Sequence, residues 1–142
     1  MWNNKLDFIL HISKLNMILS KFFDSSLWLL WLNEFIVLYH LHHAPNKTLR
    51  RIDLAEKVGL TASGITRLLL PMEKIGLVEK KVNPNDARVS LVSIASGWKK
   101  QLDDALIRIQ EQLDDKISQD QDENLTHTIP LLREIGTQFL WK

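Results

Sequence analysis

The stretch RIDLAEKVGLTASGITRLL, residues 51–69, has the pattern of two short helices joined by a tight turn. Within it, Ala55, Gly59 and Ile65 stand four and then six residues apart. Helices that cross closely need a small residue at the crossing, and the turn between them needs a residue that accepts a positive φ angle. Ala55 and Gly59 meet these needs, and Ile65 anchors the second helix inward. The spacing therefore predicts a helix-turn-helix, with a plain helical hairpin of another all-α fold as the alternative.

The second helix of this pair is expected over residues 62–75, capped by Thr61 and ended by Gly76. Its inward residues at helical spacing are Ile65, Leu68, Leu69, Met72 and Ile75, and its opposite face shows Ser63, Thr66, Arg67, Leu70 and Lys74. Small hydroxyl side chains and an arginine on the outer N-terminal face suit a DNA major groove. The helix residues predicted to contact DNA are Thr61, Ser63, Thr66 and Arg67.

The next stretch, VNPNDARVSLVSI, residues 82–94, has a turn-rich tip between apolar-alternating arms, which predicts a two-stranded hairpin. A helix-turn-helix followed by such a ribbon is a winged helix. The narrow, negative minor groove of DNA favours an inserted arginine, and Arg88 is the candidate. Asp86 is expected to orient Arg88 through a charge-assisted hydrogen bond. The alternative is an incidental surface pair that contributes little.

Basic residues surround these elements. Lys80 and Lys81 lie at the base of the expected wing, and Arg50 and Arg51 lie at a helix start, where the helix dipole disfavours cations. We therefore expect all four to bind phosphates. Residues 47–88 carry nine basic and five acidic side chains, against four and nine in the C-terminal segment after residue 100. This asymmetry indicates that only the middle of the chain meets a polyanion, unless it is simply a solvated mixed surface.

The longer stretch RRIDLAEKVGLTASGITRLLLPMEKIGLVEKKVNPNDARVSLVSI, residues 50–94, resembles the MarR family of bacterial and archaeal transcription regulators. The matching positions are Leu54-Ala55, Gly59-Leu60-Thr61, Thr66-Arg67, Met72-Glu73, Gly76-Leu77-Val78 and the wing pair Asp86 and Arg88. Two features depart from the family. Ala87 replaces one of two adjacent wing arginines, and Ile94-Ala95-Ser96-Gly97 lacks the usual threonine cap before the next helix.

The resemblance implies a fold and a function. The expected fold is mainly α: a single MarR-like domain over residues 1–142, with a winged helix-turn-helix lobe over 46–95 and a two-stranded β-wing. It also implies a homodimer held by N- and C-terminal helices, here 1–24 and 98–142. Such a dimer would bind a palindromic operator in double-stranded DNA as a transcriptional regulator, a repressor released by a small ligand. The alternative is a winged-helix module that binds a partner protein and lacks sequence-specific DNA binding.

The flanking sequence contains further helical patterns, expected over 3–23, 27–43, from about 98 to 118, and 125–140. Asp24-Ser25-Ser26 is the expected cap of the second of these, and Pro130 either kinks the last or marks its start. The stripe that runs from Leu102 to Ile117 packs within the chain. We expect it also to contribute to an intermolecular contact, because these helices carry more apolar surface than one small lobe covers.

An aromatic group precedes the lobe, formed by Phe22, Trp28, Trp31 and Phe35. Simple core packing explains it, but it could also line a cavity, and the resemblance implies a small aromatic or phenolic effector there. His40 and His43, three residues apart, share a helix face, yet no third ligand lies near in sequence. We therefore predict neither a metal nor a cofactor.

Other classes of protein are disfavoured. Cysteine is absent, which removes disulfides and thiolate ligands and fits a reducing compartment. The sequence has no Gly-rich phosphate loop, nucleophile elbow or zinc-protease motif, so we do not expect an enzyme. The apolar run 27–41 is short for a membrane span and has Asn33 and Glu34 at its centre, which favours a buried helix. With no secretory signal pattern at the N-terminus, the expected location is the cytoplasm.

Overall fold

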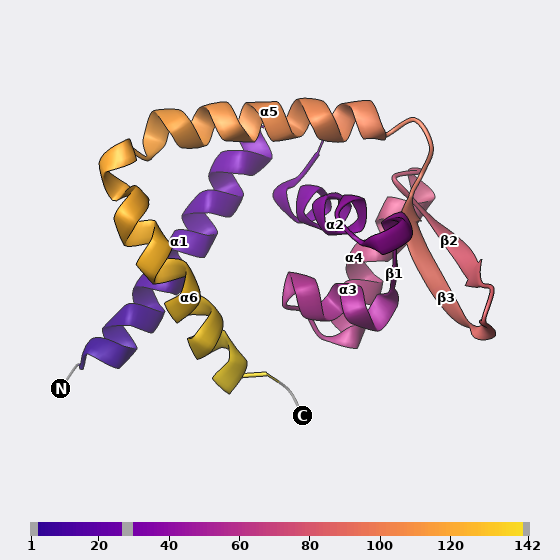
Figure 1. Cartoon of the computed structure of the whole chain (residues 1–142), viewed down its shortest axis with the longest axis horizontal. Coiled ribbons are helices and arrows are strands. Elements are labelled where there is room, and N and C mark those ends of the chain that lie inside the picture. Colours follow the sequence, from indigo (N-terminus) through magenta and orange to yellow (C-terminus); the bar gives the residue numbers. More distant parts are fainter. Residues whose placement is uncertain (1–2, 27–29, 141–142) are drawn as a thin grey trace. The chain divides into compact units, whose positions relative to one another are not determined.

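The computed structural model describes residues 3–26 and 30–140, in two compact units, Met1–Ile107 and Arg108–Lys142 (Figure 1). The first unit contains the expected winged helix-turn-helix. Its elements are α1 (Asn4–Ser26), α2 (Leu32–His42), a 3₁₀ turn (Pro45–Lys47), β1 (Thr48–Arg50), α3 (Arg51–Val58), α4 (Ala62–Lys74), β2 (Val78–Asn83) and β3 (Asp86–Ile94). Next come α5 (Lys99–Lys116), which crosses the boundary between the units, a 3₁₀ turn (Gln119–Gln121) and α6 (Asp122–Gln138).

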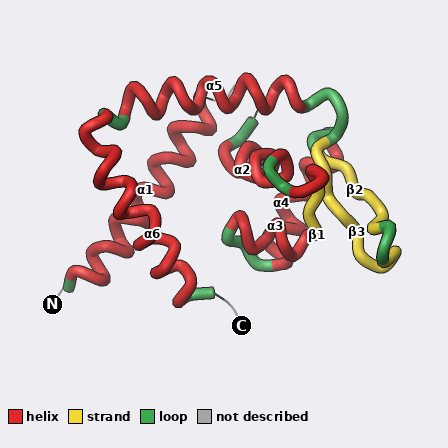
Figure 2. The backbone as a smooth tube through the Cα atoms, viewed as in Figure 1, coloured by secondary structure: helices red, strands yellow, loops and turns green. Residues whose placement is uncertain are grey.

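The wing belongs to a three-stranded antiparallel sheet with strand order β1-β3-β2, so the prediction of two strands was incomplete (Figure 2). The missed strand, β1, pairs Leu49 with Val92 of β3. β1 has only three residues and leads directly into α3, and such a short strand shows no alternation long enough to detect from sequence. The pairing ties the entry to the helix-turn-helix to the base of the wing.

The core of the first unit lies where α2, α3, α4 and the sheet meet. Its fully buried side chains include Leu38, Leu41, Leu54, Ile65, Leu69, Met72, Leu77 and Val92. The predicted inward face of α4 is confirmed at Ile65, Leu69 and Met72. It is wrong at Ile75, which is 61% exposed, because the helix ends at Lys74 and Ile75 is its C-cap. A residue beyond the last helical turn no longer follows the helical spacing.

The junction between α1 and α2 differs from the prediction. α1 continues through Ser26, so Asp24-Ser25-Ser26 does not break it, and α2 begins at Leu32 instead of residue 27. Asp24 nevertheless serves the N-terminus of α2, because its Oδ1 accepts a hydrogen bond of 2.6 Å from the Leu32 amide. An acid two residues before the end of one helix thus caps the next helix, which begins eight residues later in the sequence.

The C-terminal helices begin at slightly different places from those predicted. α5 starts at Lys99, after Gly97 turns the chain with a φ of 94°. α6 starts at Asp122 rather than 125, so Pro130 lies inside the helix and does not mark its start. Asp122 and Glu123 occupy the first turn of α6, where the dipole favours negative charge.

In the described ranges 3–26 and 30–140, no helix has both the length and the apolar character that a membrane crossing requires.

Candidate nucleic-acid interface

The crossing of α3 and α4 has the predicted form. Ala55 is 3% exposed, and its carbonyl accepts hydrogen bonds of 2.9 Å from the amides of Gly59 and Leu60. Gly59 adopts a φ of 88°, a left-handed conformation that favours glycine. These contacts end α3 within one residue and turn the chain so that α4 begins at once. The helix-turn-helix prediction is therefore confirmed.

The first turn of α4 is exposed and capped. The Thr61 hydroxyl accepts a hydrogen bond of 3.0 Å from the Gly64 amide, which confirms Thr61 as the N-cap. Ser63 is exposed, and its Oγ lies 3.3 Å from Thr61 Oγ1. The helix N-terminus therefore presents two hydroxyl groups and free backbone amides to the outside, a combination that favours anions such as phosphates.

Arg67 is the exposed cation of this helix face. One turn after Ser63, its side chain has neither a hydrogen bond nor an ion pair to any residue that the structure describes. A guanidinium with all its donors available can form a bidentate contact with a base edge or a phosphate.

Thr66 is less available than predicted. It is half-buried, its hydroxyl donates to the Ala62 carbonyl at 2.9 Å, and it accepts a hydrogen bond of 3.2 Å from Arg51 Nη1. Both interactions lie within the helix pair. Thr66 therefore joins α3 to α4 as well as lying on the predicted DNA-facing side.

Glu73 connects these helices to the wing, and sequence reasoning did not single it out as a site residue. Its Oε1 lies 3.6 Å from Arg51 Nη2, and its Oε2 lies 3.7 Å from Lys80 Nζ. Glu73 follows Thr66 by two helical turns, so the two share one side of α4, and Arg51 reaches both. That spacing was the available signal, but the partner on α3 could not be identified without the tertiary structure.

Arg50 also has an acidic partner. It is the N-cap residue of α3, and its Nε and Nη2 donate to the two oxygens of Asp53 at 2.8 and 3.1 Å. The side-chain hydrogen bond from Arg50 lowers the pKa of Asp53, and the same bond raises the pKa of Arg50. Arg50, Arg51 and Lys80 thus each form an ion pair with an acidic residue of the same chain. A DNA phosphate would have to compete with those acids.

The tip of the wing forms the predicted pair. Asp86 Oδ1 accepts hydrogen bonds from the Arg88 amide at 3.0 Å and from Nε at 3.1 Å, and Oδ2 lies 3.3 Å from Nη2. These bonds, the side-chain bond first, lower the pKa of Asp86. The Arg88 side chain is 91% exposed, so the acid orients the guanidinium without covering it.

Lys80 and Lys81 point to different sides of β2, because successive residues of a strand face opposite sides. Lys80 approaches Glu73 of α4. Lys81 instead lines a separate pocket with His42, Lys47 and Lys99. The two adjacent lysines therefore belong to different surfaces.

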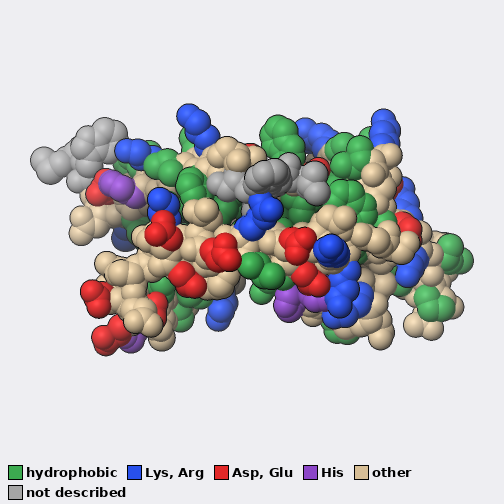
Figure 3. Space-filling view, turned by 90° about the horizontal axis from the view of Figure 1, so that it is seen from above, with side chains coloured by type: hydrophobic (Ala, Val, Ile, Leu, Met, Phe, Trp, Pro, Cys, Tyr) green, Lys and Arg blue, Asp and Glu red, His purple; other side chains and the backbone are tan. Residues whose placement is uncertain are grey.

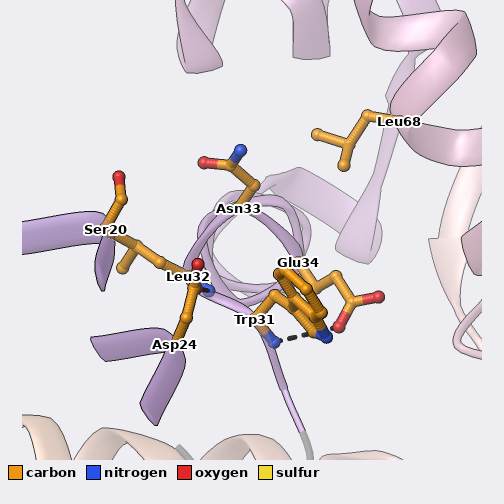
Figure 4. A pocket seen from close by; sticks show the side chains of 7 residues that line it. All are labelled: Ser20, Asp24, Trp31, Leu32, Asn33, Glu34 and Leu68. Carbon is orange, nitrogen blue, oxygen red and sulfur yellow. Dashed lines mark hydrogen bonds between the residues drawn. The ribbon is translucent and has the colours of Figure 1, made fainter. Parts of the chain in front are cut away.

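A pocket lies beside part of the aromatic group. A pocket of about 180 Å³ is lined by Ser20, Asp24, Trp31, Leu32, Asn33, Glu34 and Leu68 (Figure 4). Of the predicted ligand residues that the structure describes, Trp31 alone is among the residues that line it. The Phe22 ring packs edge-on against Phe23 at 5.2 Å, and the buried Phe35 ring lies 6.1 Å from Tyr39. Trp28 lies outside the described residues.

The histidines at the end of α2 make local contacts. The His43 ring stacks on Tyr39 at 4.3 Å, and its Nδ1 lies 2.9 Å from the Tyr39 carbonyl oxygen. Across the described parts of the chain, no three histidine or acidic side chains group in a way that could hold a metal ion.

Comparison with known proteins identifies relatives of this fold. The MarR family pattern matches residues 30–90. Curated proteins gave no match. Among solved structures, the transcriptional regulator BldR from Sulfolobus solfataricus is 23% identical with a TM-score of 0.81, covering 98% of this chain and 100% of that chain.

Two further solved structures contain DNA. A mutant of MarR from E. coli complexed with operator DNA is 19% identical with a TM-score of 0.74, over 91% of this chain and 94% of that chain. Sco3205, a MarR family regulator from Streptomyces coelicolor in complex with DNA, is 18% identical with a TM-score of 0.74, over 94% and 89%. These likenesses extend the shared fold to nearly the whole chain, and the region that matches the MarR family pattern, residues 30–90, contains the helix-turn-helix and part of the wing.

Proposed function

We propose that this protein is a transcriptional regulator that binds double-stranded DNA in a sequence-specific manner, as a homodimer on a palindromic operator, and that it acts as a ligand-responsive repressor. The observation that carries the proposal is a set of exposed polar and basic groups on two elements, which we propose as one DNA surface. They are Ser63 and Arg67 in the N-terminal turns of α4, and Arg88 at the wing tip, which is 91% exposed and oriented by Asp86.

The proposed contacts follow from this geometry. The N-terminal half of α4 enters the major groove, where Ser63 and Arg67 contact base edges. Thr61 supports the position of this helix by capping its N-terminus, and Thr66 supports it through the hydrogen bond from Arg51. Arg88 enters the minor groove. Arg50, Arg51 and Lys80 lie around this surface and exchange their acidic partners for phosphates.

The dimer is proposed from apolar surface that the chain leaves uncovered. Large apolar side chains are exposed on α1, and no residue of α6 is buried. The exposed residues are Leu6, Ile9, Leu10, Leu15, Met17, Ile18 and Leu19 on α1, and Leu125, Ile129, Leu131 and Leu132 on α6. Surfaces of this kind indicate an interface. We therefore propose residues 46–95 as the DNA-binding lobe of one MarR-like domain, and the helices within 1–24 and 98–142 as its dimerisation elements.

The pocket beside Trp31 is the proposed effector site. Figure 4 shows the Trp31 ring beside Glu34, with Asp24 on another side of the pocket, and the Trp31 amide donates to Glu34 Oε1 at 3.0 Å. Two carboxylates disfavour an anionic ligand. The pocket therefore suits a neutral or cationic aromatic molecule better than an anionic one.

Selection of preferred duplexes from a random pool tests the proposal. We expect enrichment of a sequence with two-fold symmetry, because a symmetric dimer presents two recognition helices about 34 Å apart. Affinity for the selected duplex should fall log-linearly with salt, because several phosphate contacts release counterions. If no sequence is enriched and binding is independent of salt, a winged-helix module that contacts a partner protein explains the fold better.

A further inference from the structure

A second pocket lies away from the effector pocket, at the base of the wing. It has a volume of about 250 Å³. It is lined by His42, Asn46, Lys47, Lys81, Ser93, Ile94, Ala95, Ser96, Gly97 and Lys99, all in the first unit. The end of α2, the 3₁₀ turn, the outer side of β2 and β3, and the start of α5 therefore contribute to one concavity.

The lining is strongly basic. Three lysines, Lys47, Lys81 and Lys99, come from three separate elements, and His42 adds a fourth nitrogen group. In the space-filling view, basic and acidic side chains both lie near a histidine on the face turned to the reader (Figure 3). Like charges from separate elements repel one another, so their convergence costs free energy unless an anion offsets it.

The neighbouring groups shift the pKa of His42. Its pKa lies below the usual value of 6.5, first because of burial and then because of the positive charge of Lys47, with His43 and Lys99 acting in the same direction. Asp103 acts in the opposite direction, as a nearby acid on α5. Two lysines and one acid therefore lie close enough to His42 to affect its pKa.

Ser93 provides an independent indication of a ligand. Its side chain is 4% exposed, it lines the pocket, and its Oγ has no hydrogen-bond partner in the structure. Ser93 lies in the central strand, paired with Thr48 on one side and Glu79 on the other, so its backbone is fixed. A buried hydroxyl without a partner is costly and calls for an acceptor that fills this position.

The start of α5 adds backbone donors and a further argument from charge. The first amides of a helix have no carbonyl partner within it, and the dipole favours an anion there. The first turn of α5 contains no acid and begins with Lys99 and Lys100, which the dipole disfavours. An anion beside Lys99 would accept hydrogen bonds from the free amides and would offset the unfavourable position of the lysines.

We propose that this pocket binds the phosphate group of a small phosphorylated molecule. Lysines bind phosphate as point charges, whereas a planar carboxylate is matched by the fork of an arginine, and no arginine lines this pocket. The Lys47, Lys81 and Lys99 ammonium groups neutralise the charge, Ser93 donates its hydroxyl, and the first amides of α5, which begins at the pocket residue Lys99, are further donors. The ligand would join the wing base to α2 and α5.

A DNA phosphate is the competing occupant. Against it, Lys81 lies on the side of β2 opposite to Lys80, and Lys80 is the residue that approaches the helix-turn-helix through Glu73. The pocket thus faces away from the side of the sheet that packs on α4. We therefore assign Lys81 to this pocket and not to the DNA surface.

The test measures the full chain without DNA. Inorganic phosphate is titrated into the protein at constant ionic strength, with chloride as the reference salt, while the Tm and the His42 imidazole resonance are followed by differential scanning fluorimetry and NMR. We expect phosphate to raise the Tm and to raise the pKa of His42, because a bound anion favours the protonated imidazole. Equal effects of phosphate and chloride would overturn the proposal.

Matched variants locate the site. Lys47→Gln and Lys99→Gln should each weaken phosphate binding about tenfold, whereas Lys100→Gln, the neighbour of Lys99 outside the pocket, should bind as the wild type does. Ser93→Ala removes a buried hydroxyl without a partner, so it should not lower the Tm in chloride but should reduce the increase that phosphate causes. Equal losses in Lys99→Gln and Lys100→Gln would refute the assignment.

The DNA alternative is tested with the same variants. In phosphate-free buffer, Lys47→Gln and Lys99→Gln should bind duplex DNA within about twofold of Lys100→Gln, because they lie outside the proposed DNA surface. A loss as large as that of Arg88→Ala would assign the pocket to the DNA backbone and overturn the small-molecule proposal. Because phosphate binding is measured without DNA, failure of the proposed regulatory function would leave this result unaffected.

Discussion

Gly59 shows how a single residue fixes the turn between α3 and α4. Its φ is 88°, and a Cβ built at this position would meet no atom within 4 Å. The cost of a side chain here is therefore backbone strain alone. We expect Gly59→Ala to destabilise the protein by about 1–2 kcal/mol in chemical denaturation.

Gly136 supplies the matched control for this prediction. It lies inside α6 without a positive φ, and a Cβ there also meets nothing within 4 Å. Gly136→Ala should stabilise by roughly 0.5–1 kcal/mol through helix propensity. A neutral Gly59→Ala would show that the turn does not need its left-handed residue.

Arg88 is 91% exposed, and Asp86 orients it. Arg88→Ala should weaken binding to many duplex sequences alike and reduce the slope of log affinity against log salt by about one, measured by fluorescence anisotropy. Lys100→Ala, which removes an exposed cation from α5, should leave both unchanged. If the affinity of Arg88→Ala equals that of the wild type, the wing does not contact DNA.

His40 makes stability depend on pH. Burial, and then the positive charges of Lys57 and His43, lower its pKa below 6.5 in the folded state. The unfolded chain therefore binds more protons between these two pKa values, and stability falls as the pH drops through this range. We expect the free energy of unfolding to decrease from about pH 7 to about pH 5, and His40→Gln to flatten part of that decrease. An unchanged slope in the variant would contradict this.

At the scale of elements, α3 and α4 are joined by a polar contact as well as by apolar packing. Arg51 reaches from α3 to the Thr66 hydroxyl and the Glu73 carboxylate on α4. Thr66→Val should destabilise by about 1 kcal/mol in urea denaturation, because it removes the hydrogen bond and leaves a half-buried guanidinium with fewer partners.

Ser63→Ala is the matched control, because Ser63 lies on the same helix but is exposed. It should leave stability within about 0.5 kcal/mol and instead relax sequence preference in duplex selection. Equal stability losses in the two variants would show that Thr66 has no special part in joining the helices.

The elements also show where sequence patterns succeed and where they fail. The limits of α3 and the start of α4 were predicted correctly, because Gly59 and Thr61 are local signals that act on their own neighbours. The predicted start of α2 was wrong, because the residue that caps this helix is Asp24, eight residues before Leu32. β1 was missed because only its pairing with β3 makes it a strand.

At the scale of the whole molecule, oligomeric state should depend on the exposed face of α1. Leu10 and Ile18 are 52% and 51% exposed and lie on the same helix. The double change Leu10→Glu with Ile18→Glu should convert the dimer to monomer in sedimentation velocity, because charges buried in an interface are costly. Binding to a palindromic duplex should weaken with it.

Ile75, 61% exposed between α4 and β2, gives the matched control. Ile75→Glu places the same charge on an apolar residue outside the proposed dimerisation helices and should leave the sedimentation coefficient unchanged. A dimer that persists in the α1 double variant would mean that α1 is not part of the interface.

By itself, the sequence determined the helix-turn-helix, the wing and the Asp86–Arg88 pair, because each follows from residues close together in the chain. Only the tertiary structure decided which charges are available. It joined Arg51 and Lys80 to Glu73, left Arg67 without a partner among the residues that the structure describes, and separated Lys81 from Lys80 into a basic pocket with Ser93. The physical reason is that ion pairs and pockets form between elements distant in sequence, whose meeting depends on how the helices and the sheet pack.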